Sequence, residues 1–445
     1  MGTYTQTGGT VSTGSASGQL WMANNAGGTG SVFNLSGGTF NAAGGAVLGV
    51  RGSYTFTVSG TGVANIATMQ LGHTGGTTNN PTGRIINLDG GTLQLTNGFN
   101  YQSGTAVVNL NGGTLKAGAS TTTFWNNSAS VTATLGAGGG VVDSNGFNIT
   151  VNQVLGGAGA LTKTGAGVLT LGGANVYTGA TNVNGGGLTV SGAGTLAGTT
   201  ALSVAGGAEF RHLPAVQATV LTLGTGATMN LASGSIIGQT FGSTIAAPGA
   251  ATVGSGVFLQ MSGAYVLGNT YNVLTAAGGL DAGTFNLQLM NNTDFSAVLG
   301  QSATAVTVTP VSQAPISTAY WKGGLPGGPS VWGLSGATAS NWTLDGAGAP
   351  TSVVPGAAAN VFFSDTGAVA GDQVNMTLGA SMAVNSLTFN GPNPATLLNT
   401  TGQTLTLGGS AGAGITVGPA AAPSPSTRPS CSPARRPGPT TARTR

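Results

Sequence analysis

Charged side chains are scarce in this sequence. They make up 4% of its 445 residues, and the chain has one cysteine, Cys431, and two histidines, His73 and His212. A single cysteine excludes an intrachain disulfide and a thiolate metal site. The histidines lie far apart in the sequence with no carboxylate motif beside them, so we expect no metal site and no cofactor. Backbone hydrogen bonds and apolar stacking must therefore hold the fold together.

The basic residues are unevenly placed. Five of the 11 lysines and arginines lie between positions 428 and 445, where there is no acidic residue. The rest of the chain has six basic and eight acidic side chains, a net charge of −2. Without a basic patch that could neutralise phosphates, we expect no nucleic-acid partner. We also expect no transmembrane helix, because no apolar run of about 18 residues occurs, and Met1–Tyr4 do not begin a signal peptide.

Glycine, at 82 residues, is abundant instead, and much of it occurs in a recurring octapeptide. The pattern apolar-Asn-Leu-x-Gly-Gly-Thr-apolar is found at Phe33–Phe40, Ile86–Leu93 and Val108–Leu115. The interval between the last two copies falls in the range of about 20 to 50 residues that is typical of a solenoid. Because strand side chains alternate, Ile86 and Leu88 are predicted to face inward and Asn87 outward. The glycine pair then turns the chain.

A sandwich of hairpins is the structural alternative, because Asp89-Gly90 between alternating apolar runs is also a hairpin signal. The recurring register favours the solenoid. We therefore predict an all-β fold in which consecutive turns of the chain stack in register, with outward Asn and Thr side chains in ladders. Antiparallel hairpins or abundant helix between Gly30 and Val190 would contradict this prediction.

The segment from Leu155 to Val190 carries a denser pattern. Lysine, asparagine, tyrosine and threonine are combined there with regularly spaced glycine and apolar residues, at Lys163, Gly165, Gly167, Leu169, Leu171, Asn175, Tyr177, Gly179, Thr181, Val183 and Leu188. This segment resembles the autotransporter-associated β-strand repeat, also called the passenger-associated transport repeat. The resemblance implies that these residues are structural and that the fold is a right-handed parallel β-helix of the pectin-lyase-like type.

The same resemblance implies a secreted or surface-displayed bacterial passenger, which in the full-length protein is extracellular or at the outer membrane. We expect a structural, adhesin-like role without catalysis. The expected partner is a cell-surface or matrix polysaccharide, contacted by exposed ladders and loops on a rigid rod. The sequence does not identify an export or anchoring partner.

Composition and pattern divide the chain into four segments. Residues 1–200 are predicted to hold the β-helix turns, including the repeat at 155–190. Residues 201–315 stay β-rich but lose the strict repeat, and we expect them to continue the solenoid or to cap it. Residues 316–418 are predicted to form a second β unit, which opens with the sequence Tyr-Trp-Lys-Gly.

The last segment, 419–445, changes abruptly to Pro, Ser, Thr and Arg, and is predicted to be disordered. Codons that encode Ser426–Thr441 also permit a β-like segment when the reading frame is shifted by one base. We therefore expect an out-of-frame tail on a fragment of a longer passenger.

Three tryptophans are the candidate binding residues. Trp321, Trp332 and Trp342 follow one another at short and nearly equal intervals. Flat aromatic rings can stack on sugars through apolar and dispersion contacts, so a carbohydrate-binding module is the first functional alternative. The other interpretation of these side chains is that they fill the core of the second β unit.

A polysaccharide lyase or hydrolase built on the β-helix is the second functional alternative. It would need acid and base side chains within reach of one substrate, and the one compact charged group is Glu209, Arg211 and His212. On a strand, Glu209 and Arg211 share a face opposite His212, which predicts a local ion pair. Ser410 lies in a G-x-S-x-G match, but no histidine follows it, so we assign no catalytic residue.

Overall fold

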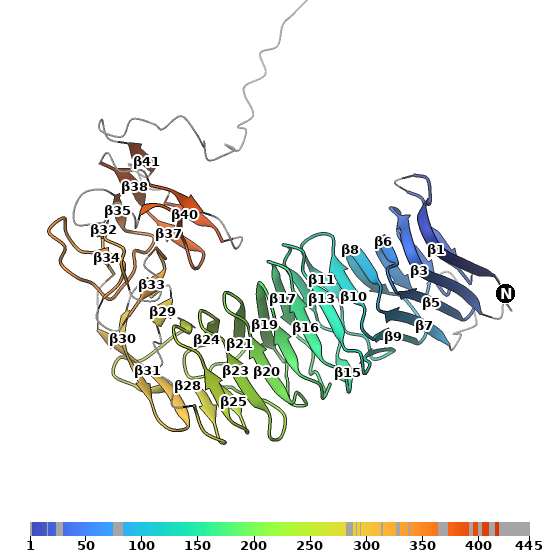
Figure 1. Cartoon of the computed structure of the whole chain (residues 1–445), viewed down its shortest axis with the longest axis horizontal. Helices are drawn as coiled ribbons and strands as arrows, with labels where there is room; N and C mark the ends of the chain where they lie inside the picture. Colours follow the sequence, from blue (N-terminus) through green and yellow to red (C-terminus); the bar gives the residue numbers. More distant parts are fainter. Residues whose placement is uncertain are drawn as a thin grey trace, which may run out of the picture.

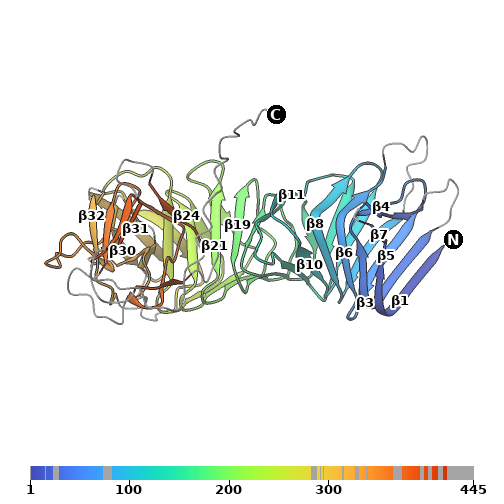
Figure 2. The same ribbon diagram turned by 90° about the horizontal axis from the view of Figure 1, so that it is seen from above.

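The computed structural model describes residues 2–15, 17–23, 30–73, 83–281, 288–290, 292–293, 295–312, 315–325, 330–336, 339–363, 373–390, 395–398, 403–408 and 414–417. Over these residues the fold is all-β, without a helix, and forms a β-solenoid of about 14 turns. This part of the chain accordingly has no helix that could cross a membrane. The molecule is an elongated, curved rod (Figures 1 and 2). The predicted tail, 419–445, lies outside the described residues.

Three parallel sheets, named I, II and III here, run along the rod. Sheet I contains β1 (Thr3–Ser12), β3 (Ser31–Ala42), β5 (Tyr54–Ser59), β7 (Arg84–Asp89), β9 (Ala106–Leu110), β12 (Val131–Leu135) and β15 (Leu155–Gly157). Sheet II contains the second halves of β1 and β3, the first halves of β6 (Val63–Leu71) and β8 (Thr92–Tyr101), and β10 (Thr114–Ala117), β13 (Gly140–Asp143), β16 (Leu161–Thr164), β18 (Thr181–Val183), β20 (Ala201–Val204), β23 (Thr228–Leu231) and β26 (Ala251–Val253).

Sheet III completes each turn. It contains β2 (Leu20–Met22), β4 (Ala46–Leu48), the second halves of β6 and β8, and β11 (Thr121–Trp125), β14 (Ile149–Val151), β17 (Val168–Leu171), β19 (Gly187–Gly192), β21 (Glu209–Pro214), β24 (Ile236–Thr240), β27 (Phe258–Ser262) and β29 (Gln288–Met290). The chain thus visits sheets I, II and III in order and returns to sheet I one turn higher.

Consecutive turns stack in register, as the sequence predicted. Leu88 lies opposite Leu110, so the interval between the last two octapeptides is one turn of the solenoid. Ile86 and Leu88 are fully buried while Asn87 is only partly covered. Every pairing that joins strands within sheets I to III is parallel, so the hairpin-sandwich alternative is wrong. Gly90, at φ 102°, takes the chain from sheet I round the corner into sheet II and not back on itself.

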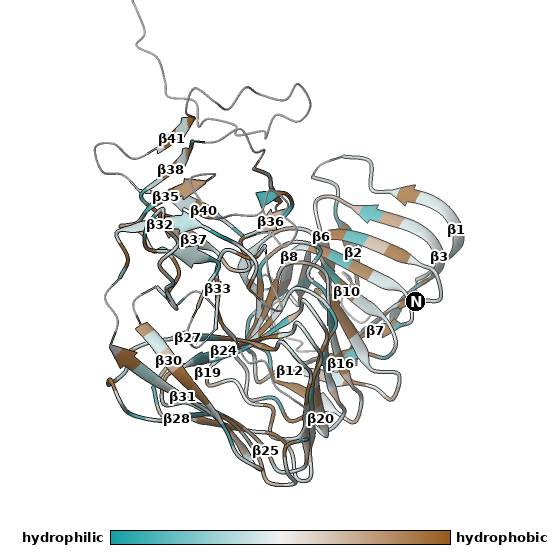
Figure 3. Ribbon diagram, turned by 60° about the vertical axis from the view of Figure 1, so that its left-hand side comes forward, coloured by the Kyte–Doolittle hydropathy of each residue, from teal (hydrophilic) through white to brown (hydrophobic). Residues whose placement is uncertain are grey.

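The interior is filled by side chains stacked turn on turn. One inward row of sheet II, which we name the sheet II lane, consists of Phe40, Ala64, Leu93, Leu115, Val142, Lys163, Val183, Val204, Leu231 and Val253. All are buried, and all but Lys163 are apolar. Figure 3 shows the resulting alternation of hydrophobic and hydrophilic residues along the strands. Each turn therefore buries its apolar face mainly against its two neighbours.

The parallel ladder of sheet I ends in an antiparallel hairpin. Hydrogen bonds from Val176 N to Leu155 O (2.9 Å) and from Gly224 N to Thr199 O (3.0 Å) carry the sheet past β15. It continues as a five-stranded sheet of β22 (Val220–Thr222), β25 (Thr244–Ala247), β28 (Tyr271–Ala276), β31 (Ala305–Ser312) and β30 (Phe295–Gln301). The last strand, β30, pairs antiparallel with β31, and β31 antiparallel with β28.

A second, shorter solenoid follows. Its strands are β32 (Thr318–Trp321), β35 (Asn360–Phe363), β38 (Ser386–Phe389) and β41 (Gly414–Val417) in one parallel sheet, β36 (Met376–Thr377) with β39 (Leu397–Leu398), and β37 (Met382–Val384) with β40 (Leu405–Leu407). Two antiparallel pairings flank it, of β34 (Trp342–Thr343) with β32 and of β33 (Leu334–Ser335) with β29. Its apolar core is a cluster separate from that of the long solenoid.

Candidate functional site

The three tryptophans of the second unit are buried, which corrects the expectation that they are available for stacking on sugars. Trp321, Trp332 and Trp342 have exposed fractions of 1%, 1% and 0%. Their rings contact one another, with Trp342 edge-on to Trp321 at 4.9 Å and to Trp332 at 5.5 Å between centroids. Trp342 Nε1 donates to Trp332 O at 2.8 Å. The physical reason is strand alternation, which directs Trp321 into the core together with Val361 and Phe363 of the next strand.

Glu209 and Arg211 form the predicted ion pair. Arg211 Nε lies 2.6 Å from Glu209 Oε1, and Arg211 also donates to Gln260 Oε1 at 3.3 Å. His212 points the other way and is 3% exposed, and burial lowers its pKa to about 4. The acid and the imidazole therefore lie on opposite faces of β21, where they cannot act on one substrate.

Two other residues were considered from the sequence, Ser410 and His73. Ser410 lies outside the described residues. The His73 ring lies 5.7 Å from the ring of Trp21. No group of three or more His, Cys, Asp or Glu side chains is placed to hold a metal ion in the part of the chain that the structure covers.

Buried polar side chains are instead concentrated where the sequence pattern is densest. Asn175 is 1% exposed and lies where sheet I lacks a regular strand. Its Oδ1 accepts from Leu155 N at 3.0 Å, one turn below, and its Nδ2 donates to Gly173 O at 2.9 Å. A second donation, to Thr195 O at 3.3 Å, reaches the turn above. One amide side chain therefore bonds to backbone groups of three successive turns and adds to the few ladder bonds that sheet I makes there.

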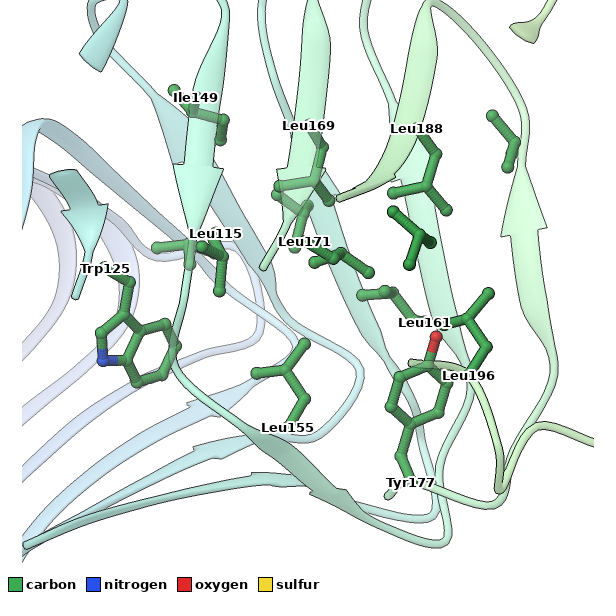
Figure 4. Close-up of a cluster of buried hydrophobic side chains, with 14 of the residues drawn as sticks. Leu115, Trp125, Ile149, Leu155, Leu161, Leu169, Leu171, Tyr177, Leu188 and Leu196 are labelled. Carbon is green, nitrogen blue, oxygen red and sulfur yellow. The ribbon is translucent and has the colours of Figure 1, made fainter. Parts of the chain in front are cut away.

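Tyr177 begins a second chain of buried hydrogen bonds. Its hydroxyl lies 2.6 Å from Thr181 Oγ1, which lies 3.0 Å from Thr199 Oγ1. Thr199 in turn donates to Gly179 O at 2.8 Å. Figure 4 shows the phenol ring among Leu155, Leu161 and Leu196, with its oxygen directed into the cluster. Burial raises the pKa of Tyr177 above its ordinary range. The hydroxyls thus satisfy one another inside an apolar core.

Lys163 is the third buried group of this segment. It is 0% exposed, and its Nζ donates to Thr164 O at 2.8 Å, Gly165 O at 2.9 Å and Gly185 O at 3.0 Å. Burial lowers its pKa to about 8, and the negative charge of Asp143 opposes that shift. The lysine remains mainly an ammonium ion at neutral pH.

Two further residues were missed by the sequence analysis. Arg84 is 2% exposed and donates to Gly49 O and Ser103 O, each at 2.5 Å. Its inward position could have been found, because it alternates with Ile86 and Leu88 on β7. Trp21 is 44% exposed beside an open groove of about 270 Å³, and no feature of the sequence around it distinguishes it from a core tryptophan.

Comparison with protein families gives a match that contains Lys163, Asn175, Tyr177 and Thr181 of this polar network. Residues 161–190 match the family model of the passenger-associated-transport-repeat. A search of curated proteins found no match. The matched segment begins at the first residue of β16 and ends within β19, so it spans sheets II and III of one turn and of the next. The resemblance inferred from the sequence is confirmed for residues 161–190, which match the family model and are built into the long solenoid.

Proposed function

We propose that this chain is the structural part of a secreted or surface-displayed bacterial passenger, adhesin-like in role and without catalysis. The observation that carries the proposal is the continuity of the repeat with the rod. Residues 161–190 are not a separate module, because their strands pair in parallel with the turns below and above them. A passenger whose repeat is part of a long solenoid is suited to present a surface at a distance.

The surface that we propose for contact is an outward row of sheet I. Its side chains, in register, are Thr5, Asn34, Thr57, Asn87, Asn109 and Thr134. They are uncharged and repeat at the strand spacing of about 4.8 Å. Asn109 Nδ2 donates to Asn87 Oδ1 at 2.9 Å, which orients the amides along the row. Regularly spaced hydroxyl and amide groups suit an uncharged polysaccharide of the cell surface or matrix, because both sides can donate and accept.

Surface display is tested on intact cells of the source organism. An antibody raised against the purified chain should bind these cells, and external protease should remove the signal without lysing them. A signal that appears only after lysis would refute the passenger proposal.

Polysaccharide contact is tested with immobilised cell-surface and matrix polysaccharides. The double variant N87A/N109A should reduce retention of the chain at least fivefold, whereas T92A/T114A, at outward positions of sheet II in neighbouring turns, should leave it unchanged. Equal retention of all three proteins would refute a role for the sheet I row. Bond cleavage in the same polysaccharides would refute the absence of catalysis.

Carbohydrate binding at the first turn is the second candidate, favoured by Trp21. Its indole is exposed, and the adjoining groove is lined by Tyr4, Thr3 and Ser31 among others. Exposed tryptophan faces bind sugar rings through apolar contact, with nearby hydroxyls as hydrogen-bonding partners. A glycan array should then detect binding by the wild-type chain that W21A loses and that the surface variant V11A keeps.

A further inference from the structure

Lys163 occupies a position at which nine other turns place an apolar residue. In the sheet II lane its neighbours in register are Val142 below and Val183 above. A leucine or methionine side chain could fill the same space in the core. Burying an ammonium group costs free energy unless its hydrogen bonds are replaced. The lysine must therefore contribute something that an apolar side chain cannot.

The contacts of the Lys163 ammonium come from the backbone. Its three hydrogen bonds go to Thr164 O, Gly165 O and Gly185 O. An ammonium group has three donors and no acceptor, so three carbonyl oxygens match it fully. Gly165 and Gly185 lie at corners outside β16 and β18, where carbonyl groups do not belong to a sheet ladder. Gly185 is in the next turn of the chain, so the ammonium joins two successive corners.

The carboxylate whose charge acts on Lys163, Asp143, is engaged elsewhere. Asp143 Oδ2 lies 3.6 Å from Nζ of Lys116, and Asp143 Oδ1 accepts from Asn145 N at 2.8 Å. The site around Lys163 is therefore a cage of carbonyl oxygens and not a salt bridge. Charge-assisted hydrogen bonds of this kind are about twice as strong as neutral ones.

We propose that Lys163 is a tethered ammonium ion in a carbonyl cage that locks the corner at Gly165 to the corner at Gly185, and that the vacated cage binds a small primary ammonium ion when the side chain is shortened. The lock fixes the register of the two turns that make up the passenger-associated-transport-repeat. Both corners are partly exposed, so an ion from solution can reach the cage.

The wild-type protein provides the first test. The chain has three lysines, Lys116, Lys163 and Lys322, so ¹⁵N-lysine labelling gives a simple spectrum. We expect one ammonium resonance with slowly exchanging protons at pH 7, absent from K163M and present in K116M. Ammonium protons of Lys163 that exchange as fast as those of Lys116 would overturn the proposal.

Hydrogen exchange tests the lock itself. In the full chain, K163M keeps the length of the side chain but removes its donors. Amides of β19 should then exchange at least tenfold faster, because the corner at Gly185 is released. The control is K116M, which removes a partly exposed lysine two turns below Lys163. It should change the same amides less than twofold. Unchanged protection of β19 in K163M would refute the lock.

Chemical rescue tests the cage as a binding site. In K163A, the protection of the β19 amides should rise at least threefold when methylammonium chloride is added. Tetramethylammonium chloride at the same concentration carries the same charge without N–H donors and should give no recovery. Equal effects of the two salts, or none from either, would overturn the binding site. If K163A does not fold, rescue is measured by its refolding yield in the two salts, with the same two outcomes.

Discussion

At the scale of the residue, strand alternation sets the direction of each side chain, and the neighbouring turns supply the hydrogen-bond partners of buried polar groups. Alternation along a strand correctly placed Ile86 and Leu88 inside and Asn87 outside. It also placed His212 on the face of its strand opposite Glu209 and Arg211. It could not indicate how a buried polar group is satisfied, because the partner lies in another turn. The carbonyl that completes the cage of Lys163 is 22 residues away. Such partners depend on the length of each corner, which alternation does not encode.

Two buried tyrosines make a matched pair for testing these hydrogen bonds. Tyr177 donates or accepts within the Tyr177–Thr181–Thr199 chain, whereas the hydroxyl of Tyr54 has no hydrogen-bond partner among the described residues. We expect Y177F to lower the free energy of unfolding by about 1–2 kcal/mol, because Thr181 loses a buried partner. Y54F should be neutral or slightly stabilising. Urea unfolding measures both, and an equal loss in the two variants would contradict the expectation.

His212 should make the protein sensitive to acid. Its pKa is about 4 in the fold because of burial, compared with about 6.5 for an exposed histidine. The folded state therefore favours the neutral imidazole, and stability that is complete above pH 6.5 is lost as the pH falls toward 4. The loss approaches about 3 kcal/mol. Unfolding free energies of wild type and H212L, measured from pH 7.5 to 4, should diverge by this amount, and parallel curves would disprove the effect.

At the scale of the secondary-structure element, the path of the chain between strands determines whether the fold is a solenoid or a sandwich of hairpins. Asp89-Gly90 is compatible with a hairpin or with a corner, and only the regular repetition of the octapeptide favoured the corner. The period is not constant, since the step from Lys163 to its partner Val183 is shorter than the step from Leu88 to its partner Leu110. Corners of different length leave the strands in register, but they make the spacing of the repeated pattern in the sequence irregular. That is why only part of the long solenoid could be divided into turns beforehand.

Close approach of successive corners predicts a strong effect of Gly167. A Cβ atom at this position would lie 1.9 Å from Phe147 O in the turn below, so G167A must displace backbone. We expect a loss of about 3 kcal/mol. The control is Gly207, which has φ +76° and open space around it. G207A should cost about 1 kcal/mol through backbone strain alone. Thermal unfolding compares the two, and a cost for G167A no larger than that for G207A would contradict the close approach.

At the scale of the whole molecule, the described residues form two main apolar cores. The long solenoid has one continuous apolar cluster, and the second unit has its own around Trp321, Trp332 and Trp342. The second unit also winds in parallel, which the sequence did not reveal. Ala319 pairs with Val361 and Val361 with Leu387, two steps of very different length, so long insertions hide the period. In such a stretch, regularly spaced tryptophans can belong to one shared core, although the same spacing also suggested a binding surface.

The separation of the cores predicts that the two units unfold in separate transitions. Contact between them is limited in the described residues to small features, including the pairing of β29 with β33 and a four-residue cluster of Met290, Leu325, Leu334 and Ala380. W342A removes a fully buried side chain from the second core, at a cost of about 3–5 kcal/mol. In a solenoid, each turn is stabilised mainly by contacts with its neighbouring turns. Destabilising one core should therefore have little effect on a distant turn.

Two probes distinguish the units during guanidinium unfolding. Tryptophan fluorescence reports mainly the second unit, which holds three of the five tryptophans, while hydrogen exchange at β7 and β9 reports the long solenoid. In W342A the fluorescence midpoint should fall and protection of β7 and β9 should stay at its wild-type value. If protection of these strands falls in parallel with the fluorescence midpoint, the small interface couples the cores into one cooperative unit, and Trp342 stabilises the entire rod.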